Sequence, residues 1–396
     1  MLETLDQQPL DALLAIIKMY REDEREGKID LGVGVYKTAD GQTPVFRAIK
    51  AAERRLLEQQ ESKGYLGLAG DTGFVDQLKP IVFGKDMADS ARIAGLQTPG
   101  GTGGVRLAAA IARAAGGKRV LIGTPSWPNH AQILHDLGYE LVEFNHARPD
   151  GSADMAALES ALGDAGRGDT GRGDVVLLHA CCHNPTGVDY TAKAWRQIAD
   201  RLVERGVLPI IDSAYQGLGH GLEPDGEGLR IIVDRLPEAL IAYSCDKNFG
   251  MYRDRVGAFF ALGQSADGVE RIMSHAFAQA RATWSMPPDH GGAAVRMALA
   301  DEGLRADWHE ELTSMRERIR SVRQALADKG TAGSVDLTPL ARQNGMFAVL
   351  PVSKAQVDRM REDHAVYMAG SGRINVAGLT MDNIETFTDA LAQVTA

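Results

Sequence analysis

Short, continuously apolar runs bounded by turn residues recur along this 396-residue chain. Apolar and polar residues do not alternate within them, which is typical of strands that are covered on both faces. Amphipathic helical patterns lie among the runs, and alternation of strand and helix predicts a parallel sheet with helices on both sides. The expected strands are 118–123, 174–180, 207–212, 239–244 and 256–262, and the clearest helical patterns are 105–115, 195–204 and 229–236.

The pattern changes after a long charged amphipathic helix expected at 304–329. Short strands at 345–350 and 373–376, with helices at 354–363 and from Met381, indicate a smaller α+β domain. The stretch 15–35 contains a short Gly-rich strand, IDLGVGV, and is expected to pack with that domain. We therefore predict an N-terminal arm at 1–11, a small domain built from 12–43 and 315–396, and a large domain at 44–314.

Composition excludes several classes of function. The chain has 43 Lys and Arg against 53 Asp and Glu and no basic block, which argues against nucleic acid or an anionic membrane as a partner. No apolar run approaches the ~20 residues that cross a bilayer. The start, MLETLDQQ, carries acids where a signal peptide has positive charge, so a cytoplasmic location is expected. Cys181, Cys182 and Cys245 fit neither a disulfide framework nor zinc spacing, and no metal site is expected.

One polar loop, 163–174, imitates two functional motifs. Gly166, Gly168 and Gly171 match G-x-G-x-x-G, which would suggest an NAD-dependent oxidoreductase. That fingerprint needs a strand before it and a helix after it, whereas this loop leads directly into a strand. The loop also contains Arg-Gly-Asp twice, which would suggest an adhesion module, but adhesion requires export. We expect an ordinary surface loop.

Polar side chains converge at the ends of the expected strands, where open α/β sheets bind ligands. Asp212 ends one strand and Tyr215 follows it, while Asn184 and Lys247 follow two other strands. A glycine-rich run, 100–104, opens the helix at Val105. Each residue alone is weak evidence, because a single lysine or aspartate at such a place is usually solvated or a helix cap.

Together these residues match the needs of pyridoxal phosphate. This cofactor requires an amine for a Schiff base, a carboxylate near its ring nitrogen, donors for its phenolate oxygen and a cradle for its phosphate. A lysine can supply the amine and also carry a proton. The amides of Gly101 and Thr102 at a helix start suit the phosphate, with Ser244 and Arg255 adding a hydroxyl and a cation.

At these residues the chain resembles the class I, fold-type I aminotransferases, and specifically their aspartate/aromatic subgroup. The resemblance implies a large domain with a mostly parallel seven-stranded sheet between helices and a smaller α+β domain. It also implies pyridoxal phosphate as the cofactor. The matching stretches are 31–37 (LGVGVYK), 65–67 (YLG), 98–103 (TPGGTG), 126–130 (SWPNH), 181–187 (CCHNPTG), 212 with 214–217, 247–250 (KNFG) with 255–257, 287–288, 344–347 and 371–378 (SGRINVAG).

The resemblance implies a role for each matching residue near the cofactor. Lys247 would form the Schiff base and act as general acid and base, and Asp212 would pair with the ring nitrogen. The phenolate oxygen would receive hydrogen bonds from Tyr215 and Asn184. The other implied contacts are Trp127 stacked on the ring, His130 with His179 bracing Asp212, and Gly101, Thr102, Ser244 and Arg255 holding the phosphate.

The resemblance also implies how substrates are bound. Arg373 would hold the α-carboxylate through its planar donors, a geometry that lysine lacks. Gly34, Trp127 and Asn184 would complete the substrate site. Arg281 would bind the distal carboxylate of a dicarboxylic substrate in the partner subunit, and Tyr65 and Ser285 would reach the partner's phosphate, so the active unit would be a homodimer.

The implied reaction is a ping-pong exchange between amino acids and 2-oxo acids, with aspartate and 2-oxoglutarate giving oxaloacetate and glutamate. The alternative is a broad aromatic aminotransferase, or one with both specificities. Gly64, Trp284 and Met286 favour the alternative, because they replace an asparagine, a tyrosine and a second asparagine that the aspartate enzymes commonly have. Asp246 also departs from the small neutral residue usual before the lysine, and would favour a protonated Schiff base if the two groups lie close.

Overall fold

The computed structural model describes residues 2–7, 12–165 and 173–396. The three glycines of the loop motif, Gly166, Gly168 and Gly171, lie outside the described residues, as do the first Arg-Gly-Asp triplet and the start of the second. The chain divides into two compact units. The smaller comprises 1–43, 319–341 and 346–396, and the larger comprises 44–318 and 342–345. We predicted a small domain of 12–43 and 315–396 and a large domain of 44–314. This division into domains stays a prediction.

The larger unit contains a seven-stranded sheet in the order β2-β8-β7-β6-β5-β3-β4. Neighbouring strands from β7 to β4 are parallel, whereas β8 is antiparallel to both β7 and β2. The predicted α/β fold with a mostly parallel seven-stranded sheet is therefore confirmed. The strands are β2 (Ile93–Pro99), β3 (Arg119–Thr124), β4 (Glu140–Asn145), β5 (Asp174–His179), β6 (Leu208–Ser213), β7 (Ala239–Ser244) and β8 (Val256–Leu262).

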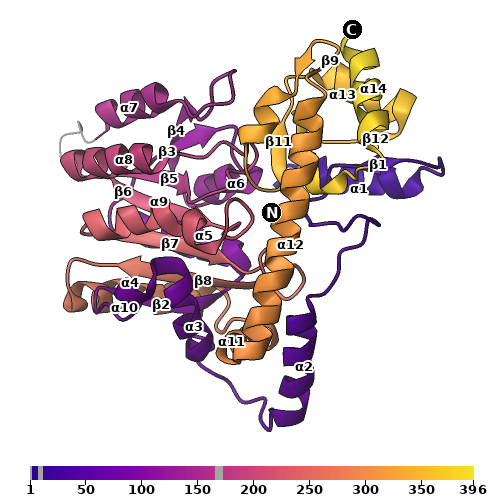
Figure 1. Ribbon diagram of the computed structural model, residues 1–396. Coiled ribbons are helices and arrows are strands. Elements are labelled where there is room, and N and C mark those ends of the chain that lie inside the picture. The colour runs from indigo at the N-terminus through magenta and orange to yellow at the C-terminus, as the bar shows by residue number, and fades with distance from the viewer. Residues whose placement is uncertain (1, 8–11, 166–172) are drawn as a thin grey trace. The chain divides into compact units, whose positions relative to one another are not determined.

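Helices lie on both faces of this sheet (Figure 1). Helix α5 packs on β6, β7 and β8 with α10 against it, while α9 contacts α3 and α8. The helices of this unit are α2 (Arg47–Gln59), α3 (Thr72–Phe83), α4 (Lys85–Ala88), α5 (Gly100–Ala114), α6 (Pro128–Asp136), α7 (Met155–Asp164), α8 (Ala192–Arg205), α9 (Leu222–Arg235), α10 (Ala266–Thr283) and α11 (Asp289–Ala300); α12 (Glu302–Asp328) continues from this unit into the other.

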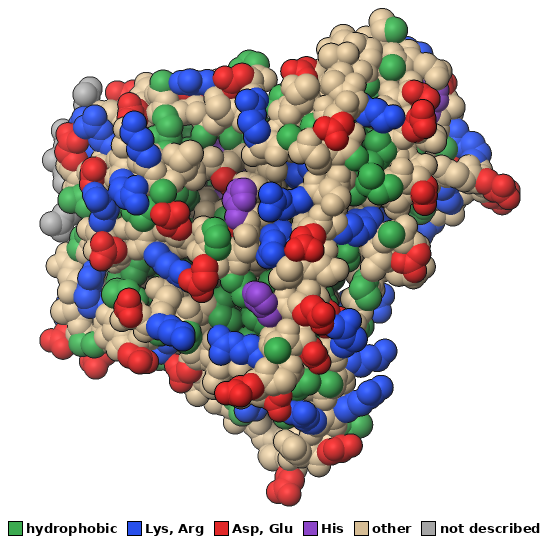
Figure 2. All heavy atoms as spheres, viewed as in Figure 1, with side chains coloured by type: hydrophobic (Ala, Val, Ile, Leu, Met, Phe, Trp, Pro, Cys, Tyr) green, Lys and Arg blue, Asp and Glu red, His purple; other side chains and the backbone are tan. Residues whose placement is uncertain are grey.

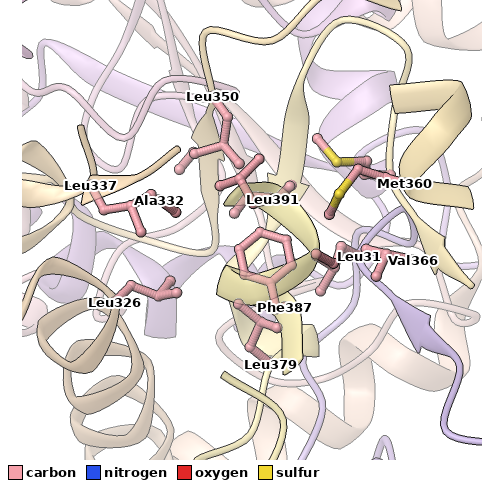
Figure 3. Packing of buried hydrophobic residues seen from close by; sticks show 14 of the residues in the cluster. Leu31, Leu326, Ala332, Leu337, Leu350, Met360, Val366, Leu379, Phe387 and Leu391 are labelled. Atoms are coloured by element: carbon pink, nitrogen blue, oxygen red, sulfur yellow. The ribbon is translucent and has the colours of Figure 1, made fainter. Parts of the chain in front are cut away.

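The smaller unit joins the beginning and the end of the chain. Strand β1 pairs in parallel with β12, and β11 pairs antiparallel with β13. Its apolar core includes Leu31 from near the start together with Phe387 and Leu391 from near the end (Figure 3). Its elements are α1 (Ala12–Glu22), β1 (Ile29–Asp30), β9 (Thr331–Ala332), β10 (Val335–Asp336), β11 (Phe347–Val349), α13 (Lys354–His364), β12 (Val366–Tyr367), β13 (Arg373–Asn375) and α14 (Ile384–Thr395), with short 3₁₀ turns at Leu2–Thr4, Thr338–Arg342 and Val376–Gly378.

Five predicted helix starts differ from the structure, and two of these differences are small: α8 begins at Ala192 rather than 195, and α12 begins at Glu302 rather than 304. Helix α5 begins at Gly100 rather than Val105, because the glycines themselves form its first turn. They are needed there: a Cβ on Gly104 would lie 3.1 Å from both the Ala242 Cβ and the Ala258 oxygen. Helix α9 begins at Leu222 rather than 229, and its proline falls in the first turn, where the missing N–H is tolerated. Helix α14 begins three residues after Met381.

The surface carries mixed charge. Figure 2 shows Lys and Arg side chains interspersed with Asp and Glu over the viewed face. Among the described residues, no helix is long and apolar enough to cross a membrane.

Candidate active site

The candidate site lies in the larger unit, at the carboxyl ends of the central parallel strands. Asp212 lies one residue before the end of β6 and pairs in register with His179, the last residue of β5. Ser244 ends β7 opposite Gly257 of β8. Parallel strands end at one edge of a sheet, so residues far apart in the sequence meet here.

One pocket collects most of the predicted cofactor residues. It encloses about 130 Å³. Asn184 Nδ2 donates to the Tyr215 hydroxyl at 3.1 Å, and Lys247 Nζ lies 5.5 Å from the centroid of the Tyr215 ring. The lining residues are Gly101, Thr102, Trp127, His179, Asn184, Asp212, Ala214, Tyr215, Ser244, Asp246, Lys247 and Arg255.

Asp212 is held by a buried relay of polar groups. His130 Nε2 lies 2.9 Å from Asp212 Oδ2, and His130 Nδ1 lies 2.9 Å from Ser126 Oγ. His130 is 0% exposed, and the Trp127 ring meets its ring edge-on at 5.0 Å between centroids. With both nitrogens of His130 engaged, the Asp212 carboxyl has a fixed orientation.

The start of α5, Ser244 and Arg255 form a compact cradle. A Cβ on Gly101 would lie 2.8 Å from the Ser244 Cβ, so a larger residue would fill the space between them. Gly100 has φ +67°, and its N–H donates to the Arg255 carbonyl at 2.7 Å. Arg255 itself has φ 54°, a conformation that few non-glycine residues adopt. Unpaired amides at a helix start together with a guanidinium suit an anion.

The electrostatics of Lys247 favour a reactive amine. Burial lowers the pKa of Lys247, and the Arg255 charge lowers it further, while Asp246 and Asp212 oppose this shift. The net direction is downward, so more of the amine is neutral at a given pH and can act as a nucleophile or a base.

Asp246, which departs from the resemblance, faces the same pocket. Its Oδ2 forms a short ion pair with Arg255 Nη1, and its backbone N–H donates to Ser244 Oγ at 3.2 Å. Its charge acts on Lys247. The side chain therefore does not turn away from the site.

Three predicted residues lie in the larger unit but do not line this pocket. Tyr65 is 94% exposed in the segment between α2 and α3. Arg281, near the end of α10, donates to the Ser285 hydroxyl at 2.6 Å, and both side chains are exposed. Met286 is near Tyr65, because its Sδ accepts from the Leu66 N–H at 3.2 Å.

The remaining two predicted substrate residues belong to the smaller unit. Arg373 Nη2 donates to the Gly32 carbonyl at 2.7 Å, and its guanidinium carbon lies 5.0 Å from the centroid of the Phe347 ring. A Cβ on Gly34 would lie 3.2 Å from the edge of that ring. Asn375 donates to the carbonyls of Val33 and Val35, which fixes the glycine segment beside Arg373.

Sequence reasoning placed His130 and His179 beside Asp212, but it missed that their rings continue as a buried row through His183 to His146. His130 and His179 have centroids 5.1 Å apart, His179 and His183 are 4.1 Å apart, and His183 stacks on His146 at 3.5 Å. Burial lowers the pKa of His146, and lowers that of His179 and His183 well below the usual value. These three rings are therefore neutral near pH 7. His146 comes from beyond β4, and no local pattern signals its contact with His183.

A buried aspartate, also missed, fixes the loop that carries Tyr215. Asp225 accepts hydrogen bonds from the backbone N–H groups of Gly217, Gly219 and His220 at 2.7–2.9 Å. The acid stands thirteen residues from Asp212 in the first turn of α9, where it would ordinarily be taken for a solvated residue.

His130, His179 and Asp212 also offer ligand atoms within 4.8 Å of one another, close enough for a metal ion. Both nitrogens of His130 are already engaged by Ser126 and Asp212. We assign the group to positioning Asp212, and the expectation of no metal stays a prediction.

The fold and this site define a protein of the aminotransferase class, and comparison with known sequences agrees. The family "Aminotransferase class I and II" matches residues 26–391, so the chain belongs to this family of enzymes. The predicted family, fold and enzyme class are confirmed.

Individual relatives cover nearly the whole chain. It is 48% identical over 380 residues to a tyrosine aminotransferase of Rhizobium meliloti, covering 96% of each chain. It is 42% identical over 402 residues to an aspartate aminotransferase of Escherichia coli, covering 100% of both. A solved aromatic-amino-acid aminotransferase from Burkholderia pseudomallei, covalently bound to pyridoxal phosphate, has a TM-score of 0.95 at 33% identity and 100% coverage of both chains.

Proposed function

We propose that the chain exchanges amino groups between amino acids and 2-oxo acids by a ping-pong mechanism with pyridoxal phosphate. Aspartate with 2-oxoglutarate, giving oxaloacetate and glutamate, is the leading substrate pair. The observation that carries the proposal is the convergence of Lys247, Asp212, Tyr215 and Asn184 in one pocket beside an anion cradle. The relative from Burkholderia pseudomallei that is covalently bound to pyridoxal phosphate supports the same cofactor.

The pocket fits this cofactor at both ends. Among the described residues, Asn184 Oδ1 and His179 Nε2 are buried without a hydrogen-bond partner, so polar capacity remains for a polar ring. At the other end, the space between Gly101 and Ser244 would be closed by a single Cβ. Gly101, Thr102, Ser244 and Arg255 would hold the phosphate, Asp212 the ring nitrogen, Tyr215 and Asn184 the phenolate oxygen, and Trp127 the ring face.

When bound, pyridoxal phosphate supplies an electron sink for the electrons of a broken substrate Cα bond. The side chains supply the remaining functions. Lys247 would hold the cofactor covalently, and its Nζ, once displaced by the substrate amine, would be free to take the proton from the substrate Cα. Asp212, oriented by His130, would present its carboxyl group to the ring nitrogen. Arg373 and the Gly34 segment would bind the α-carboxylate.

A homodimer with shared sites is part of the proposal. Arg281, Tyr65 and Ser285 do not line the pocket that contains Lys247, although each matches a residue of the active site in the resemblance. A side chain as exposed as Tyr65 is available to a second subunit. A cytoplasmic location, expected from the acidic start of the sequence, also stays a prediction.

The alternative substrate class is aromatic. Trp284 and Trp127 pack against the same apolar cluster of the larger unit, and Met286 contacts the Tyr65 segment. Large apolar groups near Arg281 would suit a ring as well as a carboxylate. The tyrosine aminotransferase among the relatives agrees with this possibility. Measuring kcat/KM for the amino donors aspartate and phenylalanine, and for the short acceptor glyoxylate, distinguishes the two specificities.

Two experiments test the proposal directly. Purified enzyme should convert aspartate and 2-oxoglutarate to oxaloacetate, and borohydride reduction followed by digestion should find a pyridoxyl adduct at Lys247. Lys247→Ala should lose the adduct and the visible absorption band, whereas Lys193→Ala, on the exposed side of α8, should keep both. Bound cofactor without an adduct at position 247 would overturn the assignment, and adduct formation without turnover would overturn the reaction.

The shared site has its own test. Lys247→Ala and Arg281→Leu subunits are each inactive on aspartate, but a hybrid dimer contains one intact site if Arg281 acts across the interface. Random mixing should restore about a quarter of wild-type activity, because half the dimers are hybrids and half of their sites are intact. If Arg281 acts within its own subunit, mixing restores nothing.

A further inference from the structure

Asp246 has no role in the reaction proposed above, although it occupies the cradle assigned to the phosphate. It is 3% exposed and lines the pocket beside Gly101, Ser244 and Arg255. Its Oδ2 takes the short ion pair with Arg255, while Oδ1 is buried without a hydrogen-bond partner among the described residues. Burying a carboxylate oxygen without a hydrogen bond costs free energy, unless a hydrogen-bond donor binds the oxygen or the carboxylate takes up a proton.

The guanidinium that would serve the phosphate is thus already neutralised. Arg255 Nη1 donates to Asp246 and to the Tyr252 carbonyl at 3.1 Å. The Arg255 backbone accepts a hydrogen bond from the Gly100 N–H, which keeps the residue beside the start of α5. A phosphate in this cradle would place its negative charge next to the Asp246 carboxylate. The two negative charges would repel each other and weaken phosphate binding.

We propose, on the basis of the cofactor site proposed above, that Asp246 couples cofactor binding to proton uptake. The phosphate binds best when Asp246 is protonated, because the neutral carboxyl no longer repels the phosphate, can donate a hydrogen bond to it and releases Arg255. Cofactor affinity therefore falls as the pH rises. Asp246 acts as an affinity-determining residue at the phosphate end of the site.

The surroundings of Asp246 favour its protonated form more than water does. Burial raises the pKa of Asp246, and the charges of Lys247 and Arg255 with the Ser244 hydrogen bond lower it, leaving it above its usual value. Neighbouring Cys245 stays neutral, since burial raises its pKa well above the usual value. Helix α5 contributes Gly101 and Thr102 to this pocket, and neither side chain is charged. A phosphate adds negative charge, which moves the Asp246 pKa further upward and draws in the proton.

The test compares two cofactor forms in matched proteins. Dissociation constants for pyridoxal phosphate and for pyridoxal, which lacks the phosphate, are measured by absorbance from about pH 6 to about pH 9. Asp246→Asn keeps the shape without the charge, and Asp246→Ser is a second variant if the first does not fold. Asp254→Asn removes one negative charge beside Arg255 from a residue outside the pocket, and serves as the control.

As the pH rises, the affinity of every protein for pyridoxal phosphate is measured and the slopes are compared. Wild type and Asp254→Asn should lose up to about tenfold more affinity per pH unit than the Asp246 variants lose. Asp246→Asn should bind pyridoxal phosphate about tenfold more tightly than wild type at the highest pH, with pyridoxal changed by less than about twofold. Equal pH slopes in wild type and variant would overturn the inference. An equal change for pyridoxal would also overturn it, because Asp246 would then act through Lys247. If no adduct forms at Lys247 in wild type, the proposed function itself fails.

Discussion

Replacing Arg281 by leucine separates the two substrate classes. In the single chain the guanidinium is exposed and donates to Ser285, so the change should alter the free energy of unfolding by less than about 0.5 kcal/mol. In the assembled site, two charge-assisted hydrogen bonds to a distal carboxylate would be lost. At about 1.5–2 kcal/mol each, the loss is about 3–4 kcal/mol of transition-state binding, or roughly 10²- to 10³-fold in kcat/KM for aspartate.

The assay measures kcat/KM for aspartate and for phenylalanine with a common acceptor. Phenylalanine has no distal carboxylate, so its value should change by less than about threefold. Arg271→Leu, an exposed arginine earlier in α10, is the matched control and should leave both values unchanged. Equal losses on the two substrates would refute the role assigned to Arg281, and no loss on either would remove the argument for dicarboxylic substrates.

Other predictions concern the groups that support the site. Asp225→Leu leaves three backbone N–H groups without their acceptor and should lower the free energy of unfolding by about 3–5 kcal/mol in urea titrations; a loss below about 1 kcal/mol would contradict that role. Gly101→Ala places a Cβ 2.8 Å from the Ser244 Cβ, so it should weaken pyridoxal phosphate binding at least tenfold while pyridoxal binding changes little, as absorbance titration would show. The lowered pKa values of His146, His179 and His183 should make stability fall below about pH 6.5, because these three imidazoles take up protons in the unfolded chain but stay neutral in the folded one; each of the three should cost about 1 kcal/mol by pH 5.5, and His146→Phe should remove one such share. Unfolding curves with the same pH dependence in His146→Phe and wild type would contradict it.

Strands buried on both faces could be predicted from the sequence. Five of the seven strands in the large sheet coincide with apolar runs to within one or two residues. Strand β4 was missed because it lies at the edge of the sheet, and its pattern mixes exposed polar residues with apolar ones. Strand β2 was missed because the polar residue Gln97 interrupts its apolar pattern, as a surface residue would. Gln97 is instead fully buried, accepting from the Asp71 N–H and donating to the Pro288 carbonyl.

The candidate site was predictable where the residues follow strands or resemble family motifs. Lys247, Asp212 and Tyr215 lie at strand ends, and the topology of the sheet brings such ends together. The surroundings were not predictable in the same way. The stack of His146 on His183 and the ion pair of Asp246 with Arg255 depend on tertiary contacts that leave no periodicity in the sequence.

The pairing of β1 with β12 has a consequence for synthesis. Leu31 shares its core with Phe387 and Leu391, which are synthesised more than 350 residues later. The smaller unit therefore cannot complete its core until α14 has been made, while the larger unit has all of its described strands by residue 262. Until α14 emerges, the apolar surface around Leu31 stays uncovered, and chaperones that shield nascent chains should bind this segment for that time.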